Sequence, residues 1–523
     1  MSFDWVRGTV TNDRGGNNAN PQGFAIGLIG GSTTQRNFVF SQLPAGSAVK
    51  VGNLITITIA GHGISTGEYL SLGSRNPEWV AAIQQPTVVS ANVFTLRADF
   101  PLISRVVSSI TNTTDTENEV ILQYMSRYDI HGGFIRQALM DRAIAGNYYV
   151  AQYIGQGGDN YPQVLARMSD IVPMARKVNA TGGLVIGNVG ADGSSWLTGD
   201  PPNAVNLIRQ ITDKNCRLVL ATEFRSVDSS SGSTTPTERA AREQIRMLLD
   251  REARVNSNMR YLNLFDQYTQ RTSLHGYAPA GYFVDSVHYT QKASKQIGAQ
   301  LASLLKLWNP YTPRYMRSYV GDVWTANTPA PVGANIAQGF WTAAGTTAVA
   351  ASGGSGAVSG TMDDSIALVR TGAVAITGST SGSDRRATQL VCTSTGAATL
   401  DITLIGPAAS RIFQQLNAGS QYEVGIDYAL TGLTAVQNIE VFVDTGTSTS
   451  RLGAGASSES PVYAGLGATA IVTDNEDGAL WFPTYVTCPN PLPANFRLVF
   501  RINFSGTGGA TLQINDYVIR RIN

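Results

Sequence analysis

Cysteine is scarce in this chain of 523 residues, which contains only Cys216, Cys392 and Cys488. An odd number of cysteines at wide spacing predicts neither a disulfide framework nor a cluster of metal ligands. We expect three reduced, buried thiols, because free cysteine behaves as a small apolar side chain. Cys392 and Cys488 are the one pair that a disulfide could join, since both fall in the same β-rich region.

Charged side chains are also few: they make up 14% of the chain, and 38 lysines and arginines stand against 37 aspartates and glutamates. This balance leaves no broad basic field, so nucleic acid is excluded as the main partner. No apolar run approaches the length of about 18 residues that a membrane-spanning helix needs, which excludes a membrane partner. The N-terminus lacks the basic start and apolar run of a secretory signal, so we expect synthesis in a host cytoplasm.

Short apolar runs that alternate with helical periodicity are present instead, between about residues 20 and 310. The predicted strands are 24–29, 148–154, 184–187, 218–221 and 261–265. The predicted helices are 131–146, one with Pro162 in its first turn, one that begins after Thr235 and one that begins at Thr290. Strands that alternate with helices predict an α/β domain whose parallel sheet is covered on both faces.

Two β-rich stretches interrupt or follow this pattern. Alternating runs such as 51–59 and 93–96 predict a small β-module, residues 44–108, inserted into the α/β domain, which then comprises 1–43 and 109–310. Residues 311–345 are interpreted as a linker. From 346 to 523 only short strands between turn residues are found, namely 422–426, 439–443, 496–502 and 517–521. That pattern is typical of a β-sandwich of the jelly-roll kind.

Suitable chemical groups follow several strands of the predicted sheet, at the edge where parallel sheets bind ligands. Ser32 follows the first strand in the run Gly30-Gly31-Ser32, where a tight turn presents a hydroxyl to solvent. Gly158 follows the second strand, with Gly157 as the alternative, in a turn that leads from a strand to a helix. Asn188 follows the third strand and offers a side-chain amide.

The run Val284-Asp285-Ser286-Val287-His288 stands directly before the last predicted helix. Its spacing lets Asp285 accept a hydrogen bond from one imidazole nitrogen of His288 while the other faces a serine hydroxyl. The chain has only four histidines. His275 is the reserve candidate for the general base, His131 is a weaker one, and His62 falls in the inserted module and is interpreted as structural.

In order and context, these residues resemble the sequence blocks of the SGNH (GDSL-like) serine esterases. The resemblance covers about 20–310 apart from the insert. Gly31 stands where the family has the Asp of its Gly-Asp-Ser block, and the residues after Asn188 do not reproduce Gly-x-Asn-Asp, although Asp192 could take the place of its Asp. The resemblance implies a flavodoxin-like fold that needs no metal or cofactor. It also implies the triad Ser32, Asp285 and His288, and an oxyanion hole formed by Ser32, Gly158 and Asn188.

The resemblance also suggests a substrate class. We expect a serine esterase that removes O-acetyl groups from a bacterial surface polysaccharide, as a homo-oligomer such as a trimer, in the tail of a phage virion with tail or baseplate proteins as partners. The C-terminal sandwich could bind carbohydrate, although Trp324, Trp341 and Trp481 are interpreted as core residues. The alternatives are a receptor-binding or structural tail protein with a degenerate hydrolase domain, and a non-viral carbohydrate or lipid esterase.

Overall fold

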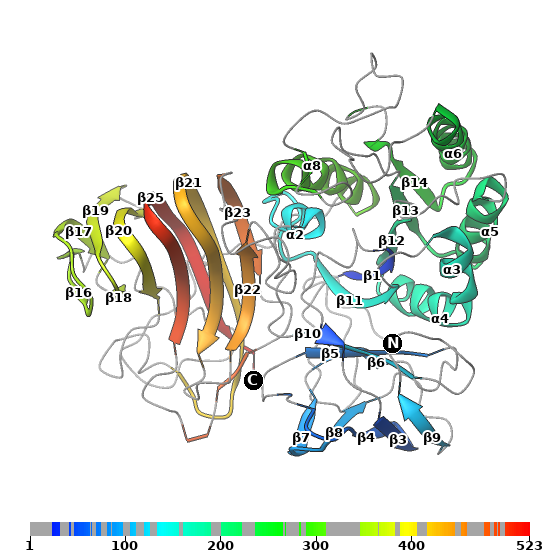
Figure 1. Ribbon diagram of the computed structural model, residues 1–523, viewed down its shortest axis with the longest axis horizontal. Helices are drawn as coiled ribbons and strands as arrows, with labels where there is room; N and C mark the ends of the chain where they lie inside the picture. The colour runs from blue at the N-terminus through cyan, green and yellow to red at the C-terminus, as the bar shows by residue number, and fades with distance from the viewer. Residues whose placement is uncertain are drawn as a thin grey trace.

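The structure, a computed structural model of the chain, contains a parallel α/β domain and two β-rich regions (Figure 1). The residues that it describes are 24–31, 41–42, 46–62, 64, 69–74, 81–84, 86–97, 105–110, 120–125, 133–155, 160–189, 200–221, 236–264, 267, 282–283, 289–309, 346–363, 366–381, 387–404, 416–444, 451–457, 475–481, 486–488, 490–491 and 497–522. Among these residues, no helix is both long and apolar enough to cross a membrane.

A parallel sheet of five strands forms the centre of the α/β domain. Its strands, in spatial order, are β11 (Tyr148–Gly155), β1 (Phe24–Gly30), β12 (Leu184–Asn188), β13 (Leu218–Ala221) and β14 (Met259–Leu262). The second and third strands in sequence therefore flank the first, which is the flavodoxin-like order. All five residues of β12 and all four of β13 are buried, as expected for a sheet covered on both faces. The predicted α/β fold class is confirmed.

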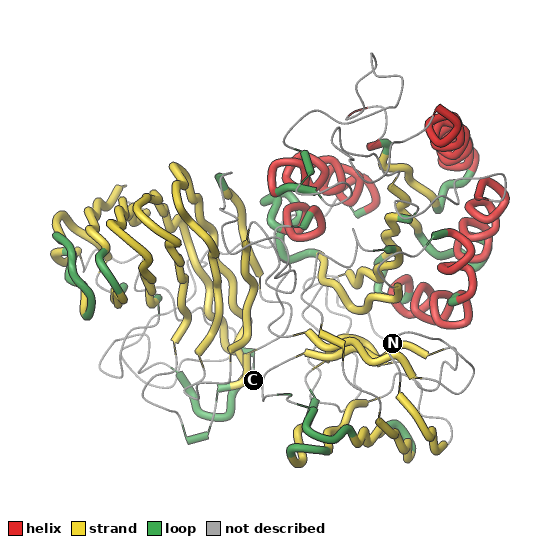
Figure 2. Tube along the Cα trace, in the orientation of Figure 1, coloured by secondary structure: helices red, strands yellow, loops and turns green. Residues whose placement is uncertain are grey.

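Helices lie on both sides of this sheet (Figure 2). They are α2 (Phe134–Leu139), α3 (Tyr161–Ala166), α4 (Met168–Asn179), α5 (Asp200–Thr212), α6 (Pro236–Val255) and α8 (Gln291–Trp308). Successive strand residues point to opposite faces of the sheet. Ile186 packs in the apolar cluster that includes α2 and α8, whereas Val185 packs in the cluster that includes α3 to α6. Helices α2 and α8 therefore cover one face of the sheet, and α3 to α6 cover the other.

The helix predicted over 131–146 is shorter in the structure, and that prediction was wrong in its extent. α2 ends at Leu139 because Asp141 starts a series of turns. The Asp141 carboxylate accepts from the N–H of Ala143 at 2.8 Å, and its carbonyl accepts from the N–H of Ala145 at 2.8 Å. A side chain that binds nearby backbone groups competes with helix continuation. Helix α5 was not predicted at all.

The inserted module contains a sheet of nine strands, which lies beside the parallel sheet with β5 and β6 next to β11 (Figure 1). Its strands are β2 (Ser41–Gln42), β3 (Gly46–Val51), β4 (Leu54–Thr58), β5 (Tyr69–Ser74), β6 (Ala81–Gln84), β7 (Thr87–Ser90), β8 (Val93–Arg97), β9 (Arg105–Ile110) and β10 (Val120–Met125). They extend beyond the expected bounds of 44–108 at both ends, because β10 joins this sheet by pairing with both β2 and β9.

His62 of this module has the structural role predicted for it. The imidazole is 6% exposed, and its Nδ1 accepts from the N–H of Ile64 at 2.9 Å. Its Nε2 lies 2.9 Å from the carbonyl oxygen of Ser90, and its ring stacks edge-on against Phe94. Both imidazole nitrogens therefore contact backbone groups of the module.

The C-terminal region is built on an eleven-stranded, mostly antiparallel sheet. Its strands are β15 (Thr346–Ala348), β16 (Ala351–Ser352), β17 (Val358–Asp363), β18 (Ala367–Thr371), β19 (Val374–Ser381), β20 (Ala387–Thr403), β21 (Gln421–Asp444), β22 (Arg451–Ser457), β23 (Glu476–Trp481), β24 (Val486–Thr487) and β25 (Arg497–Arg521). The predicted all-β character is confirmed. Cys216, Cys392 and Cys488 are buried and free, as expected, so no disulfide joins the last two.

The four short strands predicted in this region are parts of two long ones. Runs 422–426 and 439–443 both belong to β21, and residues 497–502 of the third run and the whole fourth run, 517–521, belong to β25. The glycines that suggested turns lie inside the strands, where β21 shifts register against β25 between Thr431 and Asn438. A Cβ on Gly508 would lie 2.1 Å from the carbonyl oxygen of Thr434, so glycine permits the close approach of two backbones there.

The C-terminal region contacts the α/β domain through a buried ionic triangle on α2. The Arg136 guanidinium is 1% exposed and lies 2.6 Å from the carboxylate of Glu476 in β23, which is 0% exposed. The hydroxyl of Tyr428 in β21 accepts from Arg136 at 2.9 Å and donates to Glu476 at 2.7 Å. Burial raises the pKa of Tyr428 well above its ordinary value, so this hydroxyl stays a donor.

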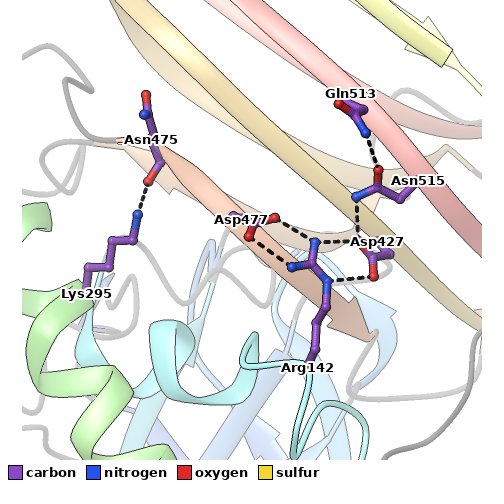
Figure 3. Close-up of polar contacts among 7 residues, drawn as sticks. All are labelled: Arg142, Lys295, Asp427, Asn475, Asp477, Gln513 and Asn515. Atoms are coloured by element: carbon purple, nitrogen blue, oxygen red, sulfur yellow. Dashed lines mark hydrogen bonds and ion pairs between the residues drawn. The ribbon is translucent and has the colours of Figure 1, made fainter. Parts of the chain in front are cut away.

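A second set of polar contacts at the same boundary is partly exposed (Figure 3). Arg142 forms bidentate hydrogen bonds of 2.6 to 2.9 Å with both Asp427 of β21 and Asp477 of β23. The hydrogen bonds from Arg142 hold the pKa of Asp477 below its ordinary value. Lys295 of α8 donates to the carbonyl oxygen of Asn475 at 2.8 Å. Both α8 and the turn after α2 are thus bound to one edge of the C-terminal region.

Backbone and apolar contacts complete this boundary. The N–H of Ala479 donates to the carbonyl oxygen of Met140 at 2.9 Å. A Cβ on Gly478 would lie 2.4 Å from the same oxygen, so glycine allows β23 to come this close. One apolar cluster runs from the α2 and α8 side of the parallel sheet into the C-terminal region. That region is therefore packed onto the α/β domain and not merely tethered to it. Trp481 packs at this boundary against the cluster of Ala145, Ala479 and Val518, in agreement with a packing role.

Gly183 gives a direct test of the sheet packing. It stands at the start of β12, and an added Cβ would lie 1.8 Å from the carbonyl oxygen of Ala25. We expect Gly183→Ala to lower the free energy of unfolding by about 1 to 3 kcal/mol or more, as overpacking does. Gly396→Ala in β20 is the control, because no atom lies within 4 Å of its added Cβ. Equal urea midpoints for the two variants would contradict this packing.

Candidate active site

Of the predicted site residues, the structure describes Asn188. The others, with their alternatives, lie outside the described residues: Ser32, Gly157, Gly158, Asp192, His131, His275, Asp285 and His288. Their chain neighbours Gly30, Gly31, Gly155, Phe283 and Tyr289 are described. The geometry of the site is therefore built from these neighbours and from Asn188.

Three strand ends that lead to predicted site residues are level with one another. Gly30, the last residue of β1, pairs with Gly155 of β11 on one side and with Asn188 of β12 on the other. The chain leaves β1 toward Ser32 and leaves β11 toward Gly158. In this sheet β11, the next strand after β1, lies on one side of β1, and β12, the strand after that, lies on its other side, so the order reverses here. Such a switch point is where open parallel sheets bind ligands.

Asn188 contacts the chain on both sides of the predicted triad. Its side chain is 0% exposed. Its carbonyl oxygen accepts from the N–H of Gly31 at 3.4 Å, and Gly31 directly precedes Ser32. Its Nδ2 lies 3.5 Å from the hydroxyl oxygen of Tyr289, which directly follows His288. One buried asparagine thus contacts both segments of chain, and Tyr289 is 101 positions from it in the sequence.

The residues that flank Asp285 and His288 in the chain are paired with each other. Phe283 and Tyr289 form an isolated antiparallel bridge, and the N–H of Thr290 donates to the carbonyl oxygen of Tyr282 at 2.9 Å. Thr290 is also the N-cap of α8, and its hydroxyl accepts from the N–H of Ala293 at 3.3 Å. Threonine is favoured there because its side chain satisfies an N–H that the helix leaves unpaired.

The turn after β11 leads into α3 through a capping box. The Asn160 side chain accepts from the N–H of Gln163 at 3.1 Å, and the Gln163 side chain accepts from the N–H of Asn160 at 2.9 Å. Pro162 lies in the first turn of the helix, as predicted. Asn160 is the N-cap of α3. The structure therefore describes both residues that flank the segment with Gly158, namely Gly155 at the end of β11 and Asn160 at the N-cap of α3.

Tyr289 is a site residue that the sequence reasoning missed. Its ring packs edge-on against Phe134 of α2 at a centroid distance of 6.4 Å, and at a tilt against Phe283 at 5.4 Å. The available signal was its position between a candidate catalytic histidine and a helix N-cap. No group of three or more histidine, cysteine, aspartate or glutamate side chains suited to a metal ion occurs in the part of the chain that the structure describes.

No protein-family model matches this sequence, and no curated protein matches it either. Among solved structures, the chain is similar to a peptidoglycan O-acetylesterase, with a TM-score of 0.28 and 13% identity over 55% of this chain and 92% of that one. It is similar to a GDSL-like lipase from Bacteroides thetaiotaomicron, with a TM-score of 0.22 and 15% identity over 31% of this chain and 77% of that one.

A third similar structure is the enzymatically active domain of tailspike protein 4 from bacteriophage CBA120. Its TM-score is 0.18, with 17% identity over 30% of this chain and 20% of that one. All three TM-scores are far below 0.5. These likenesses therefore do not decide what the chain does.

Proposed function

We propose that this chain is a serine esterase of the SGNH kind, with Ser32 as nucleophile and His288 and Asp285 as its partners. The observation that carries the proposal is the double contact of Asn188, whose carbonyl binds Gly31 and whose amide lies against Tyr289. These two neighbours stand directly before Ser32 and directly after His288 in the chain. The level ends of β1, β11 and β12 supply the surrounding edge.

The proposed reaction is acyl transfer through a covalent ester. His288 removes the proton of Ser32 while the serine oxygen attacks the carbonyl carbon of an acetyl ester. His288 then gives that proton to the departing alcohol as the ester bond breaks, which leaves an acetyl-serine. Water attacks this intermediate, His288 takes its proton, and acetate leaves as the proton returns to Ser32. The N–H groups of Ser32 and Gly158 and the amide of Asn188 stabilise the oxyanion in both halves.

The proposed substrate is an O-acetylated bacterial surface polysaccharide, met by a homo-oligomer in the tail of a phage. Two properties of the chain support this setting. Charged residues make up only 14% of the chain, which suits a surface that binds a large polar polymer. Its α/β domain is also flanked by two extensive β-sheets, of nine and eleven strands. Phage tail or baseplate proteins are the partners expected with this setting.

The test is acetate release from O-acetylated bacterial capsule or O-antigen, with p-nitrophenyl acetate as a generic ester. The matched control is the same polysaccharide after mild alkali has removed its acetyl groups. We expect acetate from the acetylated polymer and none from the control. Hydrolysis of p-nitrophenyl acetate without acetate from any polysaccharide would overturn the substrate and leave the esterase. No hydrolysis of either substrate would overturn the esterase itself.

A further inference from the structure

We infer that Tyr289 is a positioning residue for the proposed reaction, because its hydroxyl holds the amide of Asn188 in place as an oxyanion donor. This inference rests on the proposed function and adds a residue to it. The hydroxyl oxygen of Tyr289 lies 3.5 Å from Nδ2 of Asn188. An amide nitrogen carries two N–H groups, so a contact with Tyr289 is compatible with donation from the same nitrogen to a substrate oxyanion.

The contact matters because oxyanion donors work by being fixed before the charge develops. The backbone of Asn188 is held in the sheet, where it pairs with Gly30 of β1 and Ala221 of β13. Its side chain can still rotate about its own bonds, and an amide can exchange the places of its nitrogen and oxygen. A hydroxyl at a fixed position near Nδ2 favours one of these arrangements.

The hydroxyl is itself at a fixed position. The ring of Tyr289 packs against Phe134 and Phe283, and its backbone is bridged to Phe283. The next residue, Thr290, caps α8 and is bonded to Tyr282. Phenylalanine at position 289 retains the ring and its neighbours and removes only the oxygen. Tyr289→Phe therefore removes the contact with Asn188.

The experiment measures p-nitrophenyl acetate hydrolysis by Tyr289→Phe, Asn188→Ala and the double variant. We expect Tyr289→Phe to lower kcat by about 10- to 100-fold, as small misplacements of catalytic groups do, with KM almost unchanged. Asn188→Ala should lower kcat by about 100- to 1000-fold, the effect of losing one oxyanion donor. The double variant should be no slower than Asn188→Ala, because Tyr289 acts through Asn188.

Tyr282→Phe is the matched control. Its hydroxyl, on the same segment, donates to the Gln296 side chain at 2.8 Å in an exposed position. We expect Tyr282→Phe to have the kcat and the melting temperature of the wild type. Tyr289→Phe should also have the wild-type melting temperature. If Asn188→Ala does not fold, Asn188→Ser takes its place in the cycle.

Two results would overturn the inference alone: wild-type kcat in Tyr289→Phe, or losses in the double variant that multiply. In both cases the wild type is active and depends on Ser32, so the proposed esterase stands. A wild type without esterase activity, or a Ser32→Ala variant with full activity, would overturn the proposed function and this inference with it.

Discussion

Replacing either Ser32 or His288 with alanine lowers kcat for p-nitrophenyl acetate by about 10³-fold or more, and the double variant is no slower than the single ones. Nucleophile and general base act as a unit, so the loss of one removes the benefit of the other. The activity that remains comes from the oxyanion donors and from substrate binding. Steady-state kinetics on the purified variants, each with an unchanged melting temperature, provide the measurement.

Histidine 275 supplies the control for this prediction, because it is the reserve candidate for the general base. We expect His275→Ala to keep wild-type kcat. If His275→Ala were inactive while His288→Ala kept its activity, the base would be assigned wrongly although the esterase would remain. Activity in all these variants would mean that the hydrolysis does not use this triad.

Replacing Arg136 with methionine lowers the free energy of unfolding by about 3 to 5 kcal/mol. The substitution leaves the carboxylate of Glu476 buried without its guanidinium, and an uncompensated buried charge is costly. The triple variant Arg136→Met/Tyr428→Phe/Glu476→Leu should recover most of this loss, since it removes the charges and the hydroxyl together. Urea unfolding measures both changes.

Arg142→Met is the matched control at the same boundary. Its guanidinium is 44% exposed although it binds two aspartates, so solvent screens the interaction. We expect a cost of about 1 kcal/mol. Equal costs for Arg136→Met and Arg142→Met would show that burial of the ion pair does not set its contribution.

The sequence predicted the parallel sheet well because its strands are continuous apolar runs separated by helical periodicity. It predicted local ends less well, since α2 stops where Asp141 binds its own backbone neighbours. It divided β21 and β25 into short strands because glycine is typical of turns, whereas Gly508 serves a close approach of two backbones. Such an approach depends on a partner strand that is distant in sequence.

Of the candidate site, the sequence predicted the edge of the sheet on which it is built. Gly30, Gly155 and Asn188 end three neighbouring strands level with one another, as expected where parallel strands present their carboxyl ends at one edge. Tyr289 was missed because its role depends on a contact with a residue 101 positions away. Arg136 was missed for a similar reason: a charged residue on a helix suggests a solvated face, and its partner Glu476 lies 340 positions away.

The boundary between α2 and β23 also limits how this chain can be recombined. Sugar-binding modules that hang on linkers can be exchanged between enzymes by cutting the linker. A cut within 311–345 would here separate Arg136 from Glu476 and divide a single apolar cluster. Each half would then expose to solvent the apolar and charged side chains that the other half now buries. The two halves should therefore be inherited together, and a graft that exchanges the C-terminal half must carry a matching α2 with it.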